Sequence, residues 1–477
     1  MRAFLTVFSA VLVYNDGKNK VGGNSMSPNR YSGQKAVMAR VGKFISSGWF
    51  VQGDEQSNLS RRSLLAHNVI ANVIANLIGG NFFTGLLIVL QADDAFVGLI
   101  TMMTFAANLL QLVSPLVLER FNRRKPILLG IRILIHAVNI AFIGLIPFMP
   151  VAAQTKLVLL GFSVLLVNIL GAFVGPGFSV WHIAHIPPSV RVQYFSLVTM
   201  LNGIFVALFN LVGSGIVDRF KQSSQELWGL SVLRVAALLL AVVDIWTLIK
   251  IKELPVPRQA QRLRLRKLMT EPLKNKVYLR SVLVVVLWSI TVNIPGSFYT
   301  VYLLRELNIS YSYITLIASF NVVVLLALTF VWRKIYLRYN WLRPLGICIL
   351  LFAPHYFMLA FVSPGLMFLY PVGVLWSFVF VSGVNLAFTS VAFINIPQEN
   401  QTLYVGFYST ANFLAALTAA TLARTFVTGL SGLRFNFLGV PFGEKQLMML
   451  IVGVLVSIVG VVVLRIAALN KKQGLEH

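Results

Sequence analysis

The sequence predicts an all-α polytopic membrane protein whose twelve transmembrane helices form two parallel six-helix repeats. Three observations lead to this prediction. Apolar residues make up 57% of the 477 residues and charged residues only 12%, about half of the ~25% that a soluble domain carries. Apolar runs long enough to cross a bilayer recur twelve times. Short motifs in the first six runs return in the second six. This composition excludes a soluble globular fold and an intrinsically disordered chain.

The apolar runs can be placed in order along the chain, since a helix of about 20 residues crosses the hydrocarbon core. The first six predicted spans cover about residues 66–90, 96–118, 126–148, 157–180, 195–217 and 230–249. The second six cover about residues 281–303, 311–332, 344–363, 365–389, 404–428 and 447–468.

The polar segments between and beyond these spans define the domain boundaries. We expect a poorly ordered cytoplasmic extension, a first half, a basic cytoplasmic linker, a second half and a tail with a tag remnant, over residues 1–62, 63–250, 251–280, 281–470 and 471–477. The arginines of the linker are spaced as in a basic helix that lies on the membrane.

The distribution of basic residues predicts the orientation. Most of the 40 Lys and Arg residues fall in loops on one side of the predicted spans, and basic loops remain in the cytoplasm. We therefore expect a multi-pass protein of the cell (plasma) membrane with both termini cytoplasmic. The net charge of +25 then reflects membrane topology, so the bilayer is the expected partner and nucleic acid is not. One cysteine, Cys348, excludes a disulfide framework.

Three motifs repeat between the halves in the same order. Residues 76–84, which begin Asn-Leu-Ile-Gly-Gly, return at 293–300 as Asn-Ile-Pro-Gly. Residues 119–126 return at 337–344, and Ile186-Pro187 returns as Ile396-Pro397. Six spans are an even number, so both copies enter the membrane from the same side. The halves are therefore parallel repeats.

Twelve spans, two parallel halves and a long basic central loop resemble the major facilitator superfamily, in particular its poorly characterised bacterial members, over about residues 64–470. The most specific element follows the second span, where the superfamily pattern is Gly-x-x-x-Asp-Arg-x-Gly-Arg-Arg. The residues at those places are Pro115, Glu119, Arg120, Asn122, Arg123 and Arg124, so both glycines are replaced. The resemblance implies a central cavity and a cytoplasmic latch of Glu119, Arg120, Arg123 and Arg124. The alternative is that the arginines only fix the orientation.

Polar residues inside the spans are candidates for the cavity, because such groups are unfavourable in hydrocarbon. Asn72 and Asn76 share one helix face, and the repeat places Ser289 and Asn293 opposite them. With the helix placement that the resemblance implies, we expect Asn76 and Asn293 to face one substrate cavity, flanked by Trp288. Further candidates are Tyr299, Asn168, Trp376, Asn385 and Asn412. The alternative is that each amide bonds a neighbouring helix.

Glycine and proline follow both asparagines, as Gly79-Gly80 and as Pro295-Gly296. These residues loosen or kink helices, so we expect both helices to be irregular there.

The predicted spans contain few residues that could bind and release a proton during transport. Asp244 is the only acidic residue that we place inside a span, and it lies near the cytoplasmic end, where we expect water to reach it. His136, four residues after Arg132, is the other coupling candidate. We therefore expect either no proton coupling or coupling that does not depend on Asp244. Arg132 is expected to extend toward the inner surface or to contact the latch loop. Arg234 and Arg424 are expected to extend toward the outer surface, and attraction of an anion is their alternative role.

The resemblance implies a secondary active transporter that moves a small organic molecule by alternating access, as a monomer without cofactor or metal. Aromatic and apolar residues favour an amphipathic substrate, whereas the asparagines favour uptake of a neutral polar solute. Residues 171–177 resemble the antiporter motif of drug exporters, which favours efflux. A facilitative uniporter and a lipid-type flippase are alternatives. A membrane-embedded enzyme would need converging catalytic groups at one depth, and we identify none, so no enzymatic activity is expected.

Overall fold

The computed structural model describes residues 55–112, 114, 121, 123–254, 270–339, 341–391 and 401–472. Within these ranges, eleven helices are long and apolar enough to cross a membrane, and a helix bent by 46° makes a twelfth. The predicted all-helical membrane fold is confirmed. Residues 1–54, which hold most of the predicted N-terminal extension, lie outside the described residues.

The N-terminal half supplies six spans, several of them built from more than one helical element. In chain order the elements are α3 (Glu55–Ile78) with α4 (Gly80–Val89), α5 (Asp94–Asn108) with η1 (Leu109–Leu112), α7 (Lys125–His136) with η2 (Ala137–Phe142), α8 (Ile143–Leu145) and η3 (Ile146–Phe148), α9 (Ala153–His185), η4 (Pro188–Val190) with α10 (Arg191–Gln222), and α11 (Glu226–Ile249). The first helix begins at Glu55 and therefore includes the last residues of the segment predicted as an extension.

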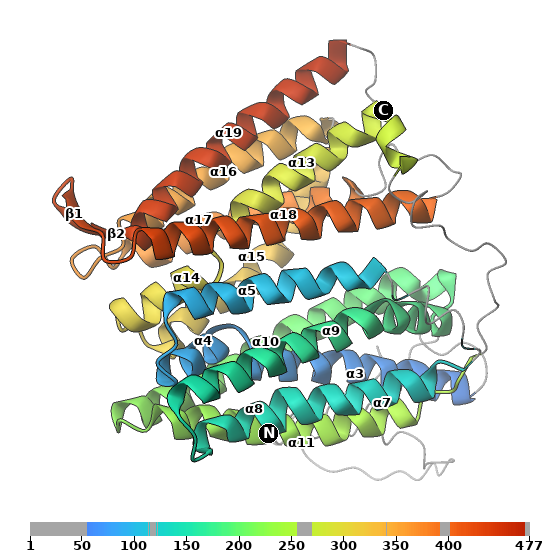
Figure 1. Ribbon diagram of the computed structural model, residues 1–477. Helices are drawn as coiled ribbons and strands as arrows, with labels where there is room; N and C mark the ends of the chain where they lie inside the picture. Colours follow the sequence, from blue (N-terminus) through green and yellow to red (C-terminus); the bar gives the residue numbers. More distant parts are fainter. Residues whose placement is uncertain are drawn as a thin grey trace, which may run out of the picture.

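The C-terminal half supplies the other six spans and a hairpin. Its elements are η5 (Pro272–Lys274), α13 (Lys276–Asn293) with α14 (Gly296–Val301) and η6 (Tyr302–Glu306), the bent α15 (Tyr311–Arg338), α16 (Leu342–Ala360), α17 (Leu369–Val391), α18 (Gln401–Gly429), β1 (Arg434–Phe437), β2 (Val440–Gly443) and α19 (Glu444–Lys472). The strands pair antiparallel, with Arg434 opposite Gly443. Figure 1 shows this half stacked on the N-terminal half.

Large apolar side chains cover the outside of the bundle. Phe162 is 67% exposed, Val242 66% and Phe330 71%. A soluble protein rarely exposes contiguous apolar surface on this scale, whereas a lipid-facing helix requires it. Side chains cap some of the helix starts: Asp93 accepts a hydrogen bond from the Phe96 amide at 2.7 Å, and Ser310 accepts one from the Tyr313 amide at 3.3 Å.

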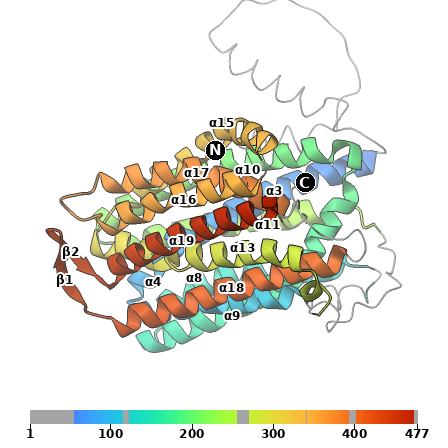
Figure 2. The same ribbon diagram turned by 90° about the horizontal axis from the view of Figure 1, so that it is seen from above.

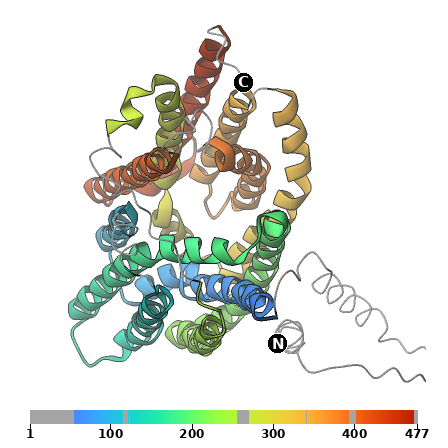
Figure 3. The ribbon, with the colours of Figure 1, turned by 90° about the vertical axis from the view of Figure 1, so that its right-hand side faces the viewer.

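The two halves meet mainly along two helix pairs, α5 with α18 and α10 with α15, and α14 adds smaller contacts with α4 and α5. Figures 2 and 3 show the membrane-spanning helices of both halves side by side, and Figure 3 is a view along these helices. Glycine permits the close approach of the halves, since a Cβ on Gly98 of α5 would lie 2.7 Å from Cγ of Arg424 on α18. We call the end of the bundle where α5, α15 and α19 begin the Asp94 end, and the end where α3 begins the Glu55 end.

Both predicted irregular helices are broken at corresponding positions. The first span breaks between α3 and α4 at Gly79, and Gly80 has φ of +49°. The seventh span breaks between α13 and α14, and Gly296 there has φ of +36°. A positive φ favours glycine, which explains why both breaks contain it. The structure thus repeats the motif that the sequence repeats.

Candidate functional site

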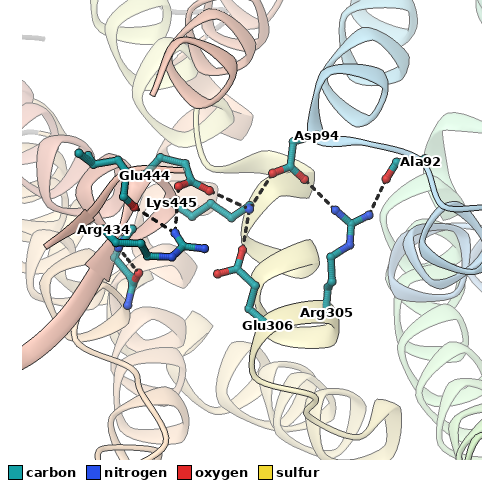
Figure 4. A network of polar contacts seen from close by, with 10 residues as sticks. Ala92, Asp94, Arg305, Glu306, Arg434, Glu444 and Lys445 are labelled. Atoms are coloured by element: carbon teal, nitrogen blue, oxygen red, sulfur yellow. Dashed lines mark hydrogen bonds and ion pairs between the residues drawn. The ribbon is translucent and has the colours of Figure 1, made fainter. Parts of the chain in front are cut away.

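A network of six charged side chains joins the two halves at the Asp94 end, as Figure 4 shows. Its members are Asp94 of the N-terminal half and Arg305, Glu306, Arg434, Glu444 and Lys445 of the C-terminal half. Three are acidic and three are basic, so their charges sum to zero. Lys445 is central: its Nζ lies 2.7 Å from Asp94 Oδ2, 2.6 Å from Glu306 Oε1 and 3.1 Å from Glu444 Oε1.

Arg305 makes the second connection between the halves within this network. Its Nη1 lies 3.1 Å from Asp94 Oδ1, and its Nη2 donates to the Ala92 carbonyl at 2.5 Å. The Lys445 side chain is only 5% exposed, whereas that of Arg305 is 32% exposed. Because burial strengthens an ion pair and raises the penalty of breaking it, Lys445 is the more consequential of the two contacts to Asp94.

Further polar contacts hold the halves together at the same end. Asp218 at the end of α10 accepts hydrogen bonds from the amides of Tyr311 and Ser312, at 2.9 and 2.7 Å, where α15 begins. A carboxylate at a helix N-terminus satisfies free amides and the helix dipole. The Tyr311 hydroxyl also donates to Glu226 at 2.6 Å, and Arg424 Nε donates to the Ala95 carbonyl at 3.0 Å. Arg424 therefore bridges the halves instead of extending to the surface.

A cavity of about 390 Å³ lies in the N-terminal half beside the break in the first span. Its walls come from α3, α4, α5, η2 and α9, and none of the described residues that line it is charged. The polar lining residues are Thr84, Thr101, Thr104, Asn139 and Asn168, and the remainder are apolar or glycine. A cavity with this lining suits an uncharged ligand that has both apolar surface and a few hydrogen-bonding groups.

A π-helix shapes one wall of this cavity. The third span changes from α to π geometry directly after His136, over Ala137–Phe142, and Asn139 of this stretch lines the cavity. Buried Arg234, 6% exposed, donates from Nη1 to the Asn139 carbonyl at 2.8 Å. Arg234 therefore does not extend to the surface as predicted. Single π turns inside α-helices often mark functional sites.

A buried carboxylate lies at the centre of a second polar cluster in the N-terminal half. Asp244 on α11 is fully buried. Its Oδ1 lies 2.6 Å from His67 Nδ1 on α3, and its Oδ2 lies 2.8 Å from His136 Nε2 and 3.1 Å from Arg132 Nε, both on α7. The cluster therefore ties three helices of one half together.

This cluster corrects two expectations and adds a residue. Water was expected to reach Asp244, but α3 and α7 cover it. Arg132 was expected to extend toward the surface, but its guanidinium turns to Asp244. His67 was not identified from the sequence as a member of this cluster, because it lies far from Asp244 along the chain. Its occurrence inside an apolar span was the available signal, since imidazole in hydrocarbon needs a polar partner.

The asparagines predicted to form the substrate cavity bond mainly within their own helices. Asn76 Nδ2 donates to the Asn72 carbonyl at 2.9 Å, and Asn210 Nδ2 donates to Asn76 Oδ1 at 3.5 Å. Asn293 Nδ2 donates to the Ser289 carbonyl at 2.7 Å. Asn76 and Asn293 are not among the residues that line the 390 Å³ cavity, whereas Asn168 is. Asn72 is exposed.

The other candidates of the C-terminal half lie against neighbouring helices. Ser289 donates to the Asn412 carbonyl at 3.3 Å. Trp288 packs against the rings of Phe352 and Phe388, at 5.5 and 6.0 Å. Three further residues were proposed to line the cavity. Trp376 Nε1 donates to the Leu351 carbonyl of α16, and Asn385 is exposed. The buried Tyr299 hydroxyl has no partner among the described residues.

The predicted latch lies only partly within the described residues. Glu119 and Arg120 fall outside them, Arg123 is exposed, and Arg124 is buried at the start of α7. The neighbouring Lys125 donates from Nζ to the carbonyls of Ile249 and Ile251, both at 2.7 Å. The end of this loop is therefore attached to the end of α11 in the same half.

Comparison with known proteins agrees with this architecture. The sequence profile described as Major Facilitator Superfamily matches residues 68–420. A search among curated proteins found no match. Similar solved structures include a point mutant of the nucleoside transporter NupG, with a TM-score of 0.64 and 12% identity over 85% of this chain and 99% of that chain. An inward-facing, unoccupied bacterial homolog of the human lysosomal transporter Spinster has a TM-score of 0.62 and 16% identity over 87% and 97%.

A third similar structure is the inward-open xylose transporter XylE from E. coli, with a TM-score of 0.60 and 13% identity over 84% of this chain and 94% of that chain. At these identities the structural matches show only the fold. The profile match spans well over half of the chain and shows the family. The chain therefore belongs to the major facilitator superfamily, as a multi-pass membrane transporter of small molecules and not an enzyme.

Proposed function

We propose that this protein is a secondary active transporter that moves a small organic molecule by alternating access, and that the conformation described here is closed at the Asp94 end. The observation that carries this proposal is the charge network centred on Lys445, which joins the halves at that end. Buried contacts between rigid halves give discrete alternatives, open and closed, as alternating access requires.

The Asp94 end is proposed to face the outside of the cell and the Glu55 end the cytoplasm. The excess of basic loops at the Glu55 end supports this orientation. It makes the conformation inward-facing, the state that the Spinster homolog and XylE adopt in the structures compared above. Both termini are then cytoplasmic.

An uncharged, amphipathic molecule is the proposed substrate class. The 390 Å³ cavity beside the break of the first span offers threonine and asparagine side chains among apolar ones. Buried cations require a compensating anion, and no carboxylate lines this cavity. The proposal includes movement of α4 about the glycine break, which would change the shape of the cavity during the cycle.

Counterflow in proteoliposomes tests the transport proposal. Candidate compounds are first selected by thermal stabilisation of the purified chain, since a ligand of the folded state raises its apparent stability. A stabilising neutral amphipathic compound is expected to accumulate transiently, against its own gradient, in vesicles preloaded with the unlabelled compound. Uptake that only equilibrates, with no such overshoot, would point to a channel and contradict the carrier.

Asn76 and Asn293 do not line the 390 Å³ cavity, and we propose that this symmetric pair contacts the substrate between the halves during the cycle. Asn76→Ala and Asn293→Ala are each expected to raise the half-saturating concentration about five- to a hundred-fold, because a substrate group left unpaired costs about 1–3 kcal/mol. Asn168→Ala should do the same, since Asn168 lines the cavity. Asn436→Ala, on the exposed face of β1, is the control. An effect of Asn168→Ala alone would confine the site to the N-terminal half and reject the symmetric pair.

The latch remains a proposal that rests on the motif around Glu119. We expect Glu119→Gln to lose most transport while the protein still inserts and folds, because the neutral amide no longer attracts the neighbouring arginines. Counterflow rates at matched reconstitution measure the effect. Glu271→Gln, at the same end of the bundle and before α13, controls for the loss of one acidic charge. Unchanged rates in Glu119→Gln would leave the arginines with orientation as their role.

A further inference from the structure

We infer that the His67–Asp244–His136–Arg132 cluster is a proton-binding site that controls closure at the Asp94 end, which makes the proton the coupling ion. This inference rests on the proposed transport function. It also reverses the expectation, made from the sequence, that Asp244 takes no part in coupling. That expectation assumed that water reaches Asp244, but this carboxylate is fully buried.

The geometry of the cluster leaves room for one exchangeable proton. Asp244 accepts from three side chains, and Arg132 already neutralises its charge. A neutral imidazole can supply the proton on Nδ1 of His67 or on Nε2 of His136, so both contacts form without any imidazolium. Uptake of one proton by either ring gives the cluster a single positive charge. That charge strengthens the hydrogen bond to Asp244, but it leaves one positive charge uncompensated in a buried cluster, which is unfavourable.

The other ionisable groups near the cluster are also histidines. On α9, the His182 ring lies 5.4 Å from the His67 ring, and its Nε2 is buried without a partner among the described residues. His185, one turn further, places Nδ1 and Nε2 each 2.8 Å from the carbonyls of Trp181 and Lys252. A cavity of about 560 Å³ at the Glu55 end is lined by Ile183, Ala184 and His185. These groups lead from the cluster toward the Glu55 end.

Two helices connect the cluster to the substrate cavity. His136 is the last residue of α7, and the π-helix that carries Asn139 begins at the next residue. His67 lies on α3 about 18 Å before the break at Gly79, and on the face opposite Asn76, about 180° around the helix. Each histidine therefore sits on a helix whose irregular continuation lines the cavity.

The first span then transmits the state of the cluster to the Asp94 end. The cluster holds α3 against α7 and α11, while α4, beyond the glycine break, packs against α14 of the C-terminal half. Because the closed conformation described here buries the cluster, an added positive charge is unfavourable in it and weakens the hold on α3. Falling pH should therefore release the closed conformation, and rising pH should favour it.

The test measures this closure without any substrate. Spin labels are attached at Gln222→Cys and Ser431→Cys, both exposed at the Asp94 end on opposite halves, in a Cys348→Ala background. Distances are measured by pulsed electron resonance in lipid nanodiscs between about pH 5 and pH 8. We expect the closed population to decrease as pH falls. A tenfold difference in proton affinity between the two conformations gives up to about a tenfold change in their ratio.

Two histidine variants locate the effect. The double variant His67→Gln, His136→Gln keeps a neutral hydrogen-bond donor at both positions but binds no proton, so the dependence on pH should disappear. His355→Gln is the matched control, since His355 sits in a membrane helix of the other half and bonds the Gly373 carbonyl. An unchanged dependence in the double variant, or none in the wild type, would overturn the inference. Neither of these results would affect counterflow, so the transport proposal would stand. A pH-dependent distance without counterflow would instead reject the transport proposal and leave the proton-binding site standing.

Discussion

Replacement of Asp244 by asparagine is expected to lower the free energy of unfolding by about 3–5 kcal/mol, the loss typical of a buried ion pair that is deprived of one partner. The shape of the side chain is kept, but Arg132 retains its positive charge with no carboxylate within reach. The amide oxygen can keep the contacts with His136 and Arg132, and the amide nitrogen then faces His67 Nδ1, which must change tautomer to accept. Titration of the detergent-solubilised protein with a denaturant measures the change in the free energy of unfolding.

A double variant separates the charge from the packing. Arg132→Gln combined with Asp244→Asn removes both charges, and we expect it to be more stable than Asp244→Asn alone, because no uncompensated charge remains. Asp93→Asn is the control for loss of a carboxylate, since Asp93 is exposed and asparagine can still cap the Phe96 amide. Wild-type stability of Asp244→Asn would show that water or another cation compensates Arg132.

The spans and the repeat were predictable because they depend on local sequence. Apolar runs of fixed length define helices in a bilayer, and charged or capping residues such as Asp93 and Ser310 mark where helices begin. The glycine breaks were predictable for the same reason, as Gly80 and Gly296 are needed at positive φ. Each of these features follows from a few neighbouring residues.

The buried cluster was only half predictable, because it depends on which helices become neighbours. Asp244 and His136 stood out as ionisable residues in apolar spans, but their exposure could not be read from the distance to the end of a helix. Packing of α3 and α7 against α11 decides it. His67 joins the cluster only through that packing.

The cavity wall illustrates a second limit. The third span reads as regular helix throughout, and no proline or glycine marks the π turn that begins at Ala137. That turn makes the Asn139 carbonyl available to Arg234 and places Asn139 at the cavity. Asn139 and Arg234 therefore acquired roles that the sequence pattern did not assign. Trp288 is the opposite case, a residue to which the sequence assigned a role in the cavity. The repeat placed its ring at the cavity, but the ring packs against Phe352 and Phe388.

Lys445→Met is expected to open the Asp94 end. Methionine fills a similar volume but leaves Asp94, Glu306 and Glu444 with two arginines, so the network acquires one uncompensated negative charge. Removing one partner of a buried, hydrogen-bonded charge pair costs about 2–5 kcal/mol. The lower figure already changes the ratio of closed to open conformations about thirtyfold. The spin-label pair at positions 222 and 431 should therefore report a longer distance at every pH.

Two further variants show whether charge balance is the cause. Lys156→Met removes a lysine at the same end whose Nζ bonds the Pro147 carbonyl inside one half, and it should leave the distance unchanged. Glu306→Gln combined with Lys445→Met restores neutrality and should recover part of the closed population, because fewer carboxylates then face each other without a cation. If Lys445→Met stayed closed, the remaining contacts between the halves, such as Asp218 with the start of α15 and Arg424 with the Ala95 carbonyl, would have to be sufficient to hold them together. The energy of closure would then lie in helix capping and close glycine packing and not in the ion pairs.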